Sequence, residues 1–147
     1  MPTYTSFDRK LAAIVRPVLG SSAMRLIAYL GLCAAYLQGG LVKLTDFPGA
    51  VSEMVHFGLS PAPLFAVLVI VLELGASVMI MTSWLRWLGA LGLAGFTLLA
   101  TGIALRFWEL PAGQERFMTA NAFFEHLGLV GGFLLVVWLD LKEQEPS

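Results

Sequence analysis

A single acidic residue, Glu73, lies in an otherwise apolar stretch, "VLVIVLELGASVMIM", that runs from Val67 to Met81. An ionised carboxylate in the centre of a membrane helix costs about 2.5–3.5 kcal/mol on insertion scales. The protein must compensate this charge, keep the group neutral, or use it. If the helix begins at Pro61 on the outer side, Glu73 lies about 18 Å deep, near the midplane.

Most other polar residues of the apolar segments lie toward the outer side of the membrane, where they suggest a polar cavity. The predicted site residues are Gln38, Lys43, Glu73, Ser77, Arg106, Asn121, Glu125 and His126. We expect the cavity to open outward, with Glu73 at its floor. The backbone of Lys43 would lie about 12–18 Å above Glu73. Unless Lys43 or Gln38 reaches it, we therefore expect a protonated or water-connected Glu73 carboxyl rather than a tight ion pair.

Three interpretations of these polar residues stay open, and the sequence identifies no catalytic residue. They form a buried ion-pair network that fixes helix register, or a site for a small ligand, a quinone head group or a proton path, or side chains that reach water at the membrane surface. His126 follows Glu125 without HxxH or ExxH spacing. We therefore expect a histidine bonded to a neighbour, and no metal site.

Membrane helices must position these side chains. The chain has 147 residues, 58% hydrophobic and 13% charged, whereas soluble domains are about 45–50% apolar and about 25% charged. A helix needs about 20 residues to cross the hydrocarbon layer. Apolar segments of this length occupy residues 25–43, 61–84, 87–106 and 121–139. We predict an all-α integral membrane protein, a four-helix bundle with up-down connectivity, whose loops at 45–60 and 107–120 face outward.

The segments outside the bundle are amphipathic or polar. Residues 1–22 form a leader, residues 23–141 the transmembrane domain and residues 142–147 a polar tail. Apolar residues at helical spacing in the leader, from Phe7 to Leu19, predict a short interfacial helix, although an accidental periodicity stays open. The first apolar run is too long for a signal peptide, so we expect a retained helix. Six Lys and Arg residues on one side against three on the other predict that both termini are cytoplasmic.

Composition and spacing narrow the partners and the packing. The net charge of −1 leaves no basic surplus, so we expect a lipid environment and no nucleic-acid partner. One cysteine, Cys33, excludes an internal disulfide and a CxxC pair. Small residues recur every fourth position and predict close helix packing: Gly31, Ala35 and Gly39, then Ala90 and Ala94, then Gly128 and Gly132.

Four stretches in order resemble the DoxX family of small bacterial membrane proteins. They are "GGLVKLTDF" from Gly39, "VLELGASVMIMTSWLRWLGALGL" from Val71, "RFWEL" from Arg106 and "NAFFEHLGLVGGFLLVV" from Asn121. The resemblance covers about residues 25–140 and implies a four-helix protein of the bacterial inner membrane. It assigns the family's lysine, glutamate and turn arginine to Lys43, Glu73 and Arg86.

The chain departs from the family pattern at two places. Arg106 stands where relatives often have a histidine, and Glu125-His126 where they often have Lys-Asn. This looks like a reversed ion pair, so we expect Arg106 and Glu125 to lie within about 4 Å. The departures put a fixed catalytic role for these positions in doubt.

Some relatives belong to redox systems, including a quinone-linked oxidoreductase. The resemblance therefore implies an accessory or anchor subunit with a redox partner enzyme. We expect no independent catalytic activity, and any activity would be that of a quinone-linked oxidoreductase component. The alternatives are a small-molecule or quinone-binding enzyme or carrier, and a stress or assembly factor without chemistry of its own. No cofactor other than a quinone is indicated, and a homo-oligomer stays open.

Overall fold

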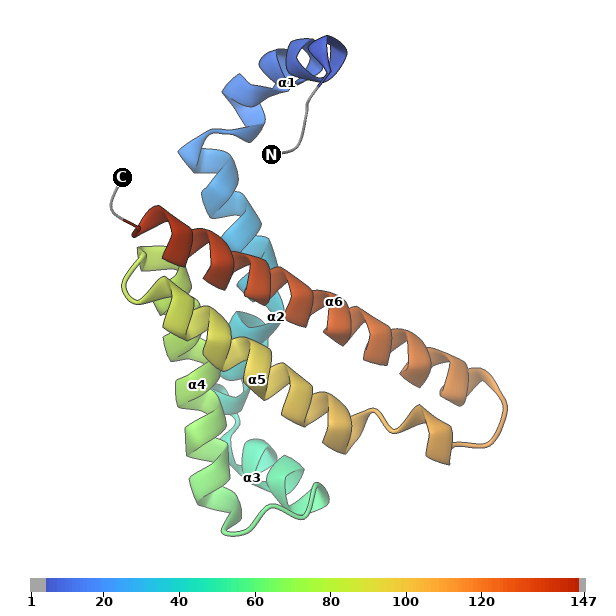
Figure 1. Cartoon of the computed structure of the whole chain (residues 1–147). Coiled ribbons are helices and arrows are strands. Elements are labelled where there is room, and N and C mark those ends of the chain that lie inside the picture. Colours follow the sequence, from blue (N-terminus) through green and yellow to red (C-terminus); the bar gives the residue numbers. More distant parts are fainter. Residues whose placement is uncertain (1–4, 146–147) are drawn as a thin grey trace. The chain divides into compact units, whose positions relative to one another are not determined.

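A computed structural model describes residues 5–145 and confirms the all-α fold. Within that range no strand occurs. Figure 1 shows the helices in chain order: α1 Ser6–Leu19, α2 Ser22–Thr45, α3 Phe47–His56, α4 Ala62–Thr82, α5 Arg86–Ala104, the 3-10 helix η1 Phe107–Glu109, and α6 Gln114–Glu143. The remaining residues of the predicted leader and tail, 1–4 and 146–147, lie outside the described residues.

The chain divides into two compact units, and the first ends at Gly31. Helix α1 begins with a capping box, in which Asp8 N–H donates to Thr5 Oγ1 at 3.2 Å and Thr5 N–H donates to Asp8 Oδ2 at 3.1 Å. None of its side chains is buried. The predicted leader helix is therefore present, while its position at the membrane surface stays a prediction.

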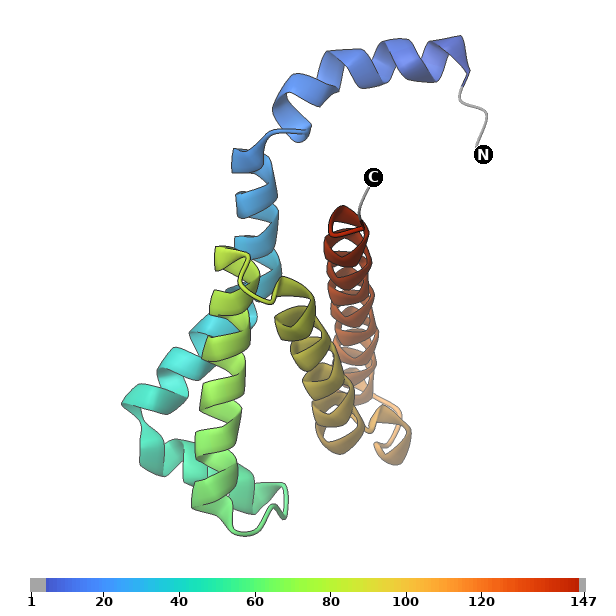
Figure 2. The same ribbon diagram turned by 60° about the vertical axis from the view of Figure 1, so that its left-hand side comes forward.

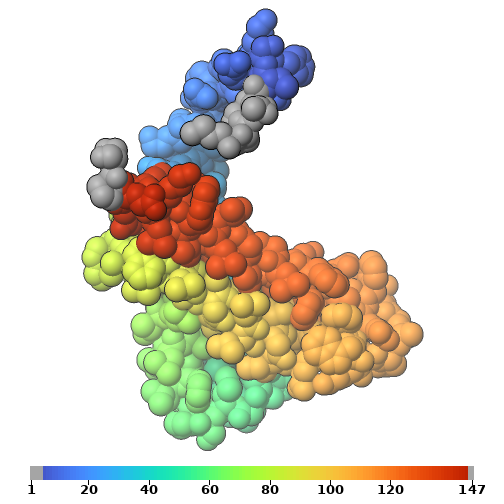
Figure 3. All heavy atoms as spheres, in the orientation of Figure 1, coloured from blue at the N-terminus to red at the C-terminus, as the bar shows by residue number. Residues whose placement is uncertain are grey.

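The second unit, from Leu32 onward, holds the bundle. Within residues 5–145, four helices are long and apolar enough to span a membrane, and each contains most of a predicted segment. Helices α5 and α6 lie side by side in two views, and α4 packs against α5 (Figures 1 and 2). Figure 3 shows α6 as a continuous outer surface of this unit. That surface exposes large apolar side chains, among them Leu134, Leu135 and Trp138, as lipid contact requires.

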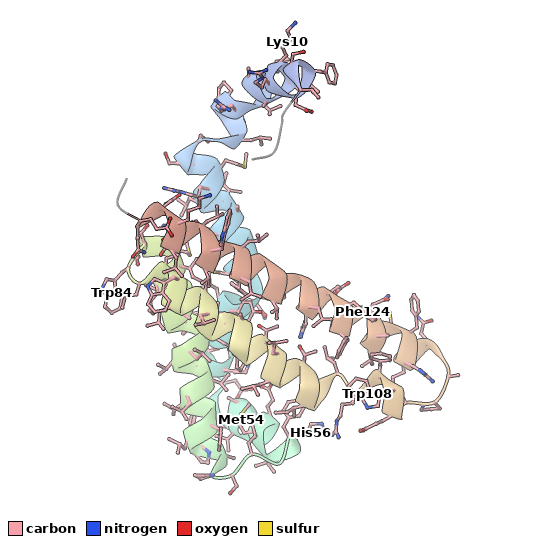
Figure 4. The ribbon with its side chains drawn as sticks, viewed as in Figure 1. Lys10, Met54, His56, Trp84, Trp108 and Phe124 are labelled. Atoms are coloured by element: carbon pink, nitrogen blue, oxygen red, sulfur yellow. The ribbon has the colours of Figure 1, made fainter. Side chains whose placement is uncertain are left out.

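The connections between the spans are more ordered than the sequence predicted. The predicted loop at 45–60 contains α3, whose first turn is capped by Asp46, which accepts a hydrogen bond from Gly49 N–H at 3.1 Å. Ala50 and Met54 of α3 are buried in one apolar cluster with Ala62 and Ala66 of α4; Met54 is labelled in Figure 4. The predicted loop at 107–120 contains η1 and the first two turns of α6.

Small residues allow close helix contact, though not all at the predicted positions. A Cβ at Gly40, beside the predicted Gly39, would lie 2.7 Å from Leu74 Cδ2. A Cβ at Gly132 would lie 3.1 Å from Leu32 Cδ1, whereas one at Gly128 would meet nothing within 4 Å. Ala90 and Ala94 are almost fully buried. The missing side chain of Gly40 therefore lets α2 lie close to α4 directly beside Glu73.

Candidate functional site

The Glu73 carboxylate is buried and paired. Glu73 is 6% exposed and Ser77 is fully buried, which confirms that both face the interior. The Lys43 ammonium lies 3.5 Å from Glu73 Oε2 and 3.7 Å from Glu53 Oε2 of α3. Lys43 therefore reaches Glu73, and the expected protonated or water-connected carboxyl is instead ion-paired. Lys43 joins α2, α3 and α4.

The depth estimate failed because α2 and α4 do not end at the same level. Gly40 lies against Glu73 and Leu74, and α2 continues only about 7 Å beyond it to Thr45. From Glu73, α4 continues about 16 Å to its start at Ala62. Helix α3 covers this extra length of α4 (Figure 2). Along the direction of the helices, Lys43 is therefore about one helical turn from the level of Glu73, rather than about three turns.

A cavity of about 470 Å³ lies next to this ion-pair group. Its wall is mainly apolar and comes from the five α-helices α2 to α6, with Ala35, Met54, Phe65, Ala100 and Leu129 as one example from each. Six polar or charged side chains complete the lining: Tyr36, Lys43, Glu53, Glu73, Thr97 and His126. Pockets of about 300–1,000 Å³ with apolar walls and a few polar groups are typical of small-molecule sites.

A chain of hydrogen bonds runs through the wall formed by α2, α5 and α6. Tyr36 Oη lies 2.5 Å from Thr97 Oγ1, and Thr101 Oγ1 lies 2.8 Å from His126 Nδ1. The Thr97 hydroxyl donates to the Leu93 carbonyl and the Thr101 hydroxyl donates to the Thr97 carbonyl, both at 2.6 Å. His126 is bonded to a neighbour, as expected. The sequence interpretation missed the other members because they are uncharged; the signal was threonine at i and i+4 on α5.

The predicted site residues fall into two groups. Lys43, Glu73 and His126 line the cavity, and Ser77 lies below Glu73, donating to its carbonyl at 2.6 Å. The side chains outside the lining are exposed: Gln38, Arg106, Asn121 and Glu125.

The predicted pair of Arg106 with Glu125 is wrong. Arg106 Nη1 instead donates to Glu109 at 3.1 Å, and no ion pair joins it to Glu125 within residues 5–145. The nearby connection is aromatic: Phe107 and Trp108 stack edge-on with Phe123 of α6, and Phe107 also meets Phe124 at 6.2 Å between ring centroids. Figure 4 shows Trp108 and Phe124 at this end of α5 and α6.

A second ion pair, which the sequence did not reveal, lies where α4 turns into α5. Arg86 Nη1 donates to Asp140 Oδ1 at 3.2 Å, and both side chains are at least 90% buried. Arg86 Nε donates to the Ile80 carbonyl at 3.0 Å, and its other nitrogen donates to Ser83. Asp140 also accepts from Trp87 N–H and Gln144. The pair therefore satisfies the end of α4, the start of α5 and the end of α6 together.

The described residues, 5–145, contain no group of three or more His, Cys, Asp or Glu that could hold a metal ion. The family model described as DoxX matches residues 24–106, which include most of α2 and all of α3 to α5, with Lys43, Glu53 and Glu73. No curated protein and no solved structure gives a significant match to the chain.

Proposed function

Because the chain belongs to the DoxX family, and its helices suit a membrane, we propose that it is a membrane subunit that holds a small quinone-class molecule for a redox system. The observation that carries this proposal is the cavity beside Lys43 and Glu73. Apolar walls suit the ring and tail of such a molecule, and the polar group at Lys43 suits its oxygen atoms.

The charges of the cavity favour a neutral head group. One ammonium, of Lys43, lies between two carboxylates, of Glu53 and Glu73, at 3.7 and 3.5 Å, so the formal charge of the three is +1 − 2 = −1. A carboxylate or phosphate head would face this excess negative charge in a poorly solvated site. The head group is neutral in both redox states: the quinone accepts hydrogen bonds and the hydroquinone also donates them. It therefore fits the cavity better than an anionic lipid.

An accessory role follows from the same assignment. The side chains around the cavity can orient a bound molecule, but a redox reaction of that molecule needs an electron donor or acceptor. We therefore propose a partner oxidoreductase that exchanges electrons with the bound molecule. The location we propose is the bacterial inner membrane, with both termini in the cytoplasm and the cavity toward the outer side.

The proposal is tested by binding to the full chain in lipid nanodiscs. The probe is a short-tailed quinone in its oxidised and reduced forms, measured by equilibrium dialysis. Ala100→Phe puts a ring into the cavity wall, whereas Leu98→Phe changes an exposed side chain of the same helix. We expect the wild type and Leu98→Phe to bind at least one form, and Ala100→Phe to lose at least tenfold in affinity.

Two results would overturn the proposal. The first is that neither form binds the wild type above empty nanodiscs. The second is that Ala100→Phe and Leu98→Phe bind equally well, because the probe would then occupy a site other than the cavity.

A further inference from the structure

The hydrogen-bond chain from Tyr36 to His126 fixes the direction of each donor. A threonine hydroxyl has one hydrogen to donate. The Thr97 hydrogen goes to the Leu93 carbonyl, so Thr97 Oγ1 must accept from the Tyr36 hydroxyl at 2.5 Å. The Thr101 hydrogen goes to the Thr97 carbonyl, so Thr101 Oγ1 must accept from His126 Nδ1–H at 2.8 Å.

This direction leaves the other ring nitrogen of His126 as an acceptor. A neutral imidazole carries one N–H, and here that hydrogen is on Nδ1, so Nε2 presents a lone pair. No protein partner of Nε2 occurs within residues 5–145. In the same range no polar side-chain atom is both buried and without a partner. Nε2 is therefore accessible, on a side chain that lines the cavity.

Most other polar groups of the cavity are acceptors as well. The Tyr36 hydroxyl has given its hydrogen to Thr97 and can only accept from a ligand. Glu53 and Glu73 accept as well. The Lys43 ammonium is the exception: it donates, and it lies 3.7 Å from the Glu53 carboxylate and 3.5 Å from that of Glu73. A ligand that offers only acceptors would therefore leave His126 and Tyr36 unpaired, and unpaired polar groups in a desolvated site weaken binding.

We infer that the cavity selects a neutral ligand that donates a hydrogen bond, with His126 Nε2 as the acceptor for its hydroxyl and Thr101 as the residue that positions the ring. This inference rests on the proposed cavity ligand. For a molecule of the quinone class it means that the reduced form, with two hydroxyl groups, binds more tightly than the oxidised form, with two carbonyl groups.

The direct test uses a pair of probes that differ in one hydrogen-bond donor and are stable to oxidation. Binding of para-hexylphenol and of its methyl ether, para-hexylanisole, is measured to the full chain in nanodiscs. We expect the wild type to prefer the phenol by about tenfold, the value of one hydrogen bond in a desolvated site. His126→Phe keeps a ring of similar size without the acceptor, and we expect it to lose this preference.

The outcomes separate the two proposals. Equal binding of phenol and ether by the wild type overturns the donor selectivity and leaves the cavity ligand standing. A preference that survives in His126→Phe overturns the role of His126. Binding of neither probe overturns this inference, and if the quinone probes also fail to bind, the proposed function falls with it.

A second measurement reads the tautomer without any ligand. The described residues contain His126 and one other histidine, His56 of α3, so ¹⁵N-histidine labelling with a His56→Gln variant leaves one ring to observe. At mildly alkaline pH we expect a protonated Nδ1 and an unprotonated Nε2. Thr101→Val removes the acceptor at Nδ1 with little change in shape, and should populate the other tautomer. A neutral wild-type ring protonated at Nε2 would overturn the assignment.

Discussion

The two ends of the bundle each hold a buried ion pair, but the two pairs differ in what surrounds them. Arg86 and Asp140 are 3.2 Å apart and are enclosed by backbone and side-chain partners from three helices. Lys43 and Glu73 are 3.5 Å apart, and Lys43 also pairs with the half-exposed Glu53. These residues border a cavity of about 470 Å³. One end is sealed, and the other has room for a molecule.

This difference shows why a buried charge is not by itself evidence of a functional site. At the sealed end, the charged side chains supply hydrogen bonds to backbone groups that would otherwise be unpaired at the helix ends. At the cavity end there are more polar side-chain atoms than are needed to satisfy the backbone groups of the helices. We therefore assign the proposed function to the cavity end, and we assign a role in stability to the Arg86–Asp140 pair at the sealed end.

The largest effect on stability is expected for Arg86→Ala. Removing one partner of a buried pair leaves the other charge uncompensated and costs about 3–5 kcal/mol. Cys33, the single cysteine, is fully buried, so its reaction with a thiol-reactive dye on heating reports unfolding. The midpoint temperature should fall strongly for Arg86→Ala; an unchanged midpoint would show that this end is not what closes the bundle.

An intermediate effect is expected for Lys43→Met. The variant leaves Glu73 without its ammonium, but the cavity gives the carboxylate room for water. We therefore expect a loss of about 1–3 kcal/mol by the same thermal assay. Glu73→Gln, which keeps the shape, should lose less than Glu73→Ala. A loss for Lys43→Met as large as for Arg86→Ala would remove the contrast between the two ends.

A small effect is expected for Arg106→Ala, which serves as the exposed control. The side chains of Arg106 and Glu109 are both about half exposed, and the pair spans only three residues. Such pairs contribute less than about 1 kcal/mol. The midpoint should stay close to that of the wild type, and a large drop would mean that the thermal assay does not rank ion pairs by burial.

The smallest effect concerns α1, outside the bundle. Hydrogen bonds from Thr5 hold the pKa of the Asp8 carboxyl below its usual value of 3.8. A depressed pKa means that the capping box stabilises the first turn of α1 above the usual value, and that this stabilisation is lost as the pH falls through the lowered one. An NMR titration of the Asp8 amide should show a midpoint below 3.8. In Asp8→Asn the transition should vanish, while the unfolding midpoint of the bundle stays unchanged.

Sequence reasoning predicted the four spans because apolar length is set by the membrane and is visible in a single sequence. It missed α3 because a ten-residue helix between two spans has no such length signal. Asp46 before Pro48, followed by Ala50 and Met54 four residues apart, was the available sign of a capped amphipathic turn. Because α3 was missed, α2 and α4 were assumed to end at the same level, and the predicted separation of Lys43 and Glu73 was too large.

The candidate site was predictable only where charge made residues conspicuous. Lys43, Glu73 and His126 were named from the sequence, and the structure places all three on the cavity wall. Tyr36, Thr97 and Thr101 were not, because tyrosine and threonine are common in membrane helices. The pair of Arg86 and Asp140 was missed because it joins residues 54 apart in sequence, and single-sequence spacing does not report such contacts.

The most direct test of the account is whether the space beside α5 is open. Ala100 lines the cavity, whereas Ala90, on the same helix, is fully buried by close packing. Thermal unfolding of Ala100→Phe and Ala90→Phe, followed by Cys33 reactivity, compares the same added ring at both places. We predict that Ala90→Phe is destabilised by at least about 1–3 kcal/mol through overpacking, while Ala100→Phe unfolds at or above the wild-type temperature. Equal destabilisation of both variants would contradict the cavity and the function proposed for it.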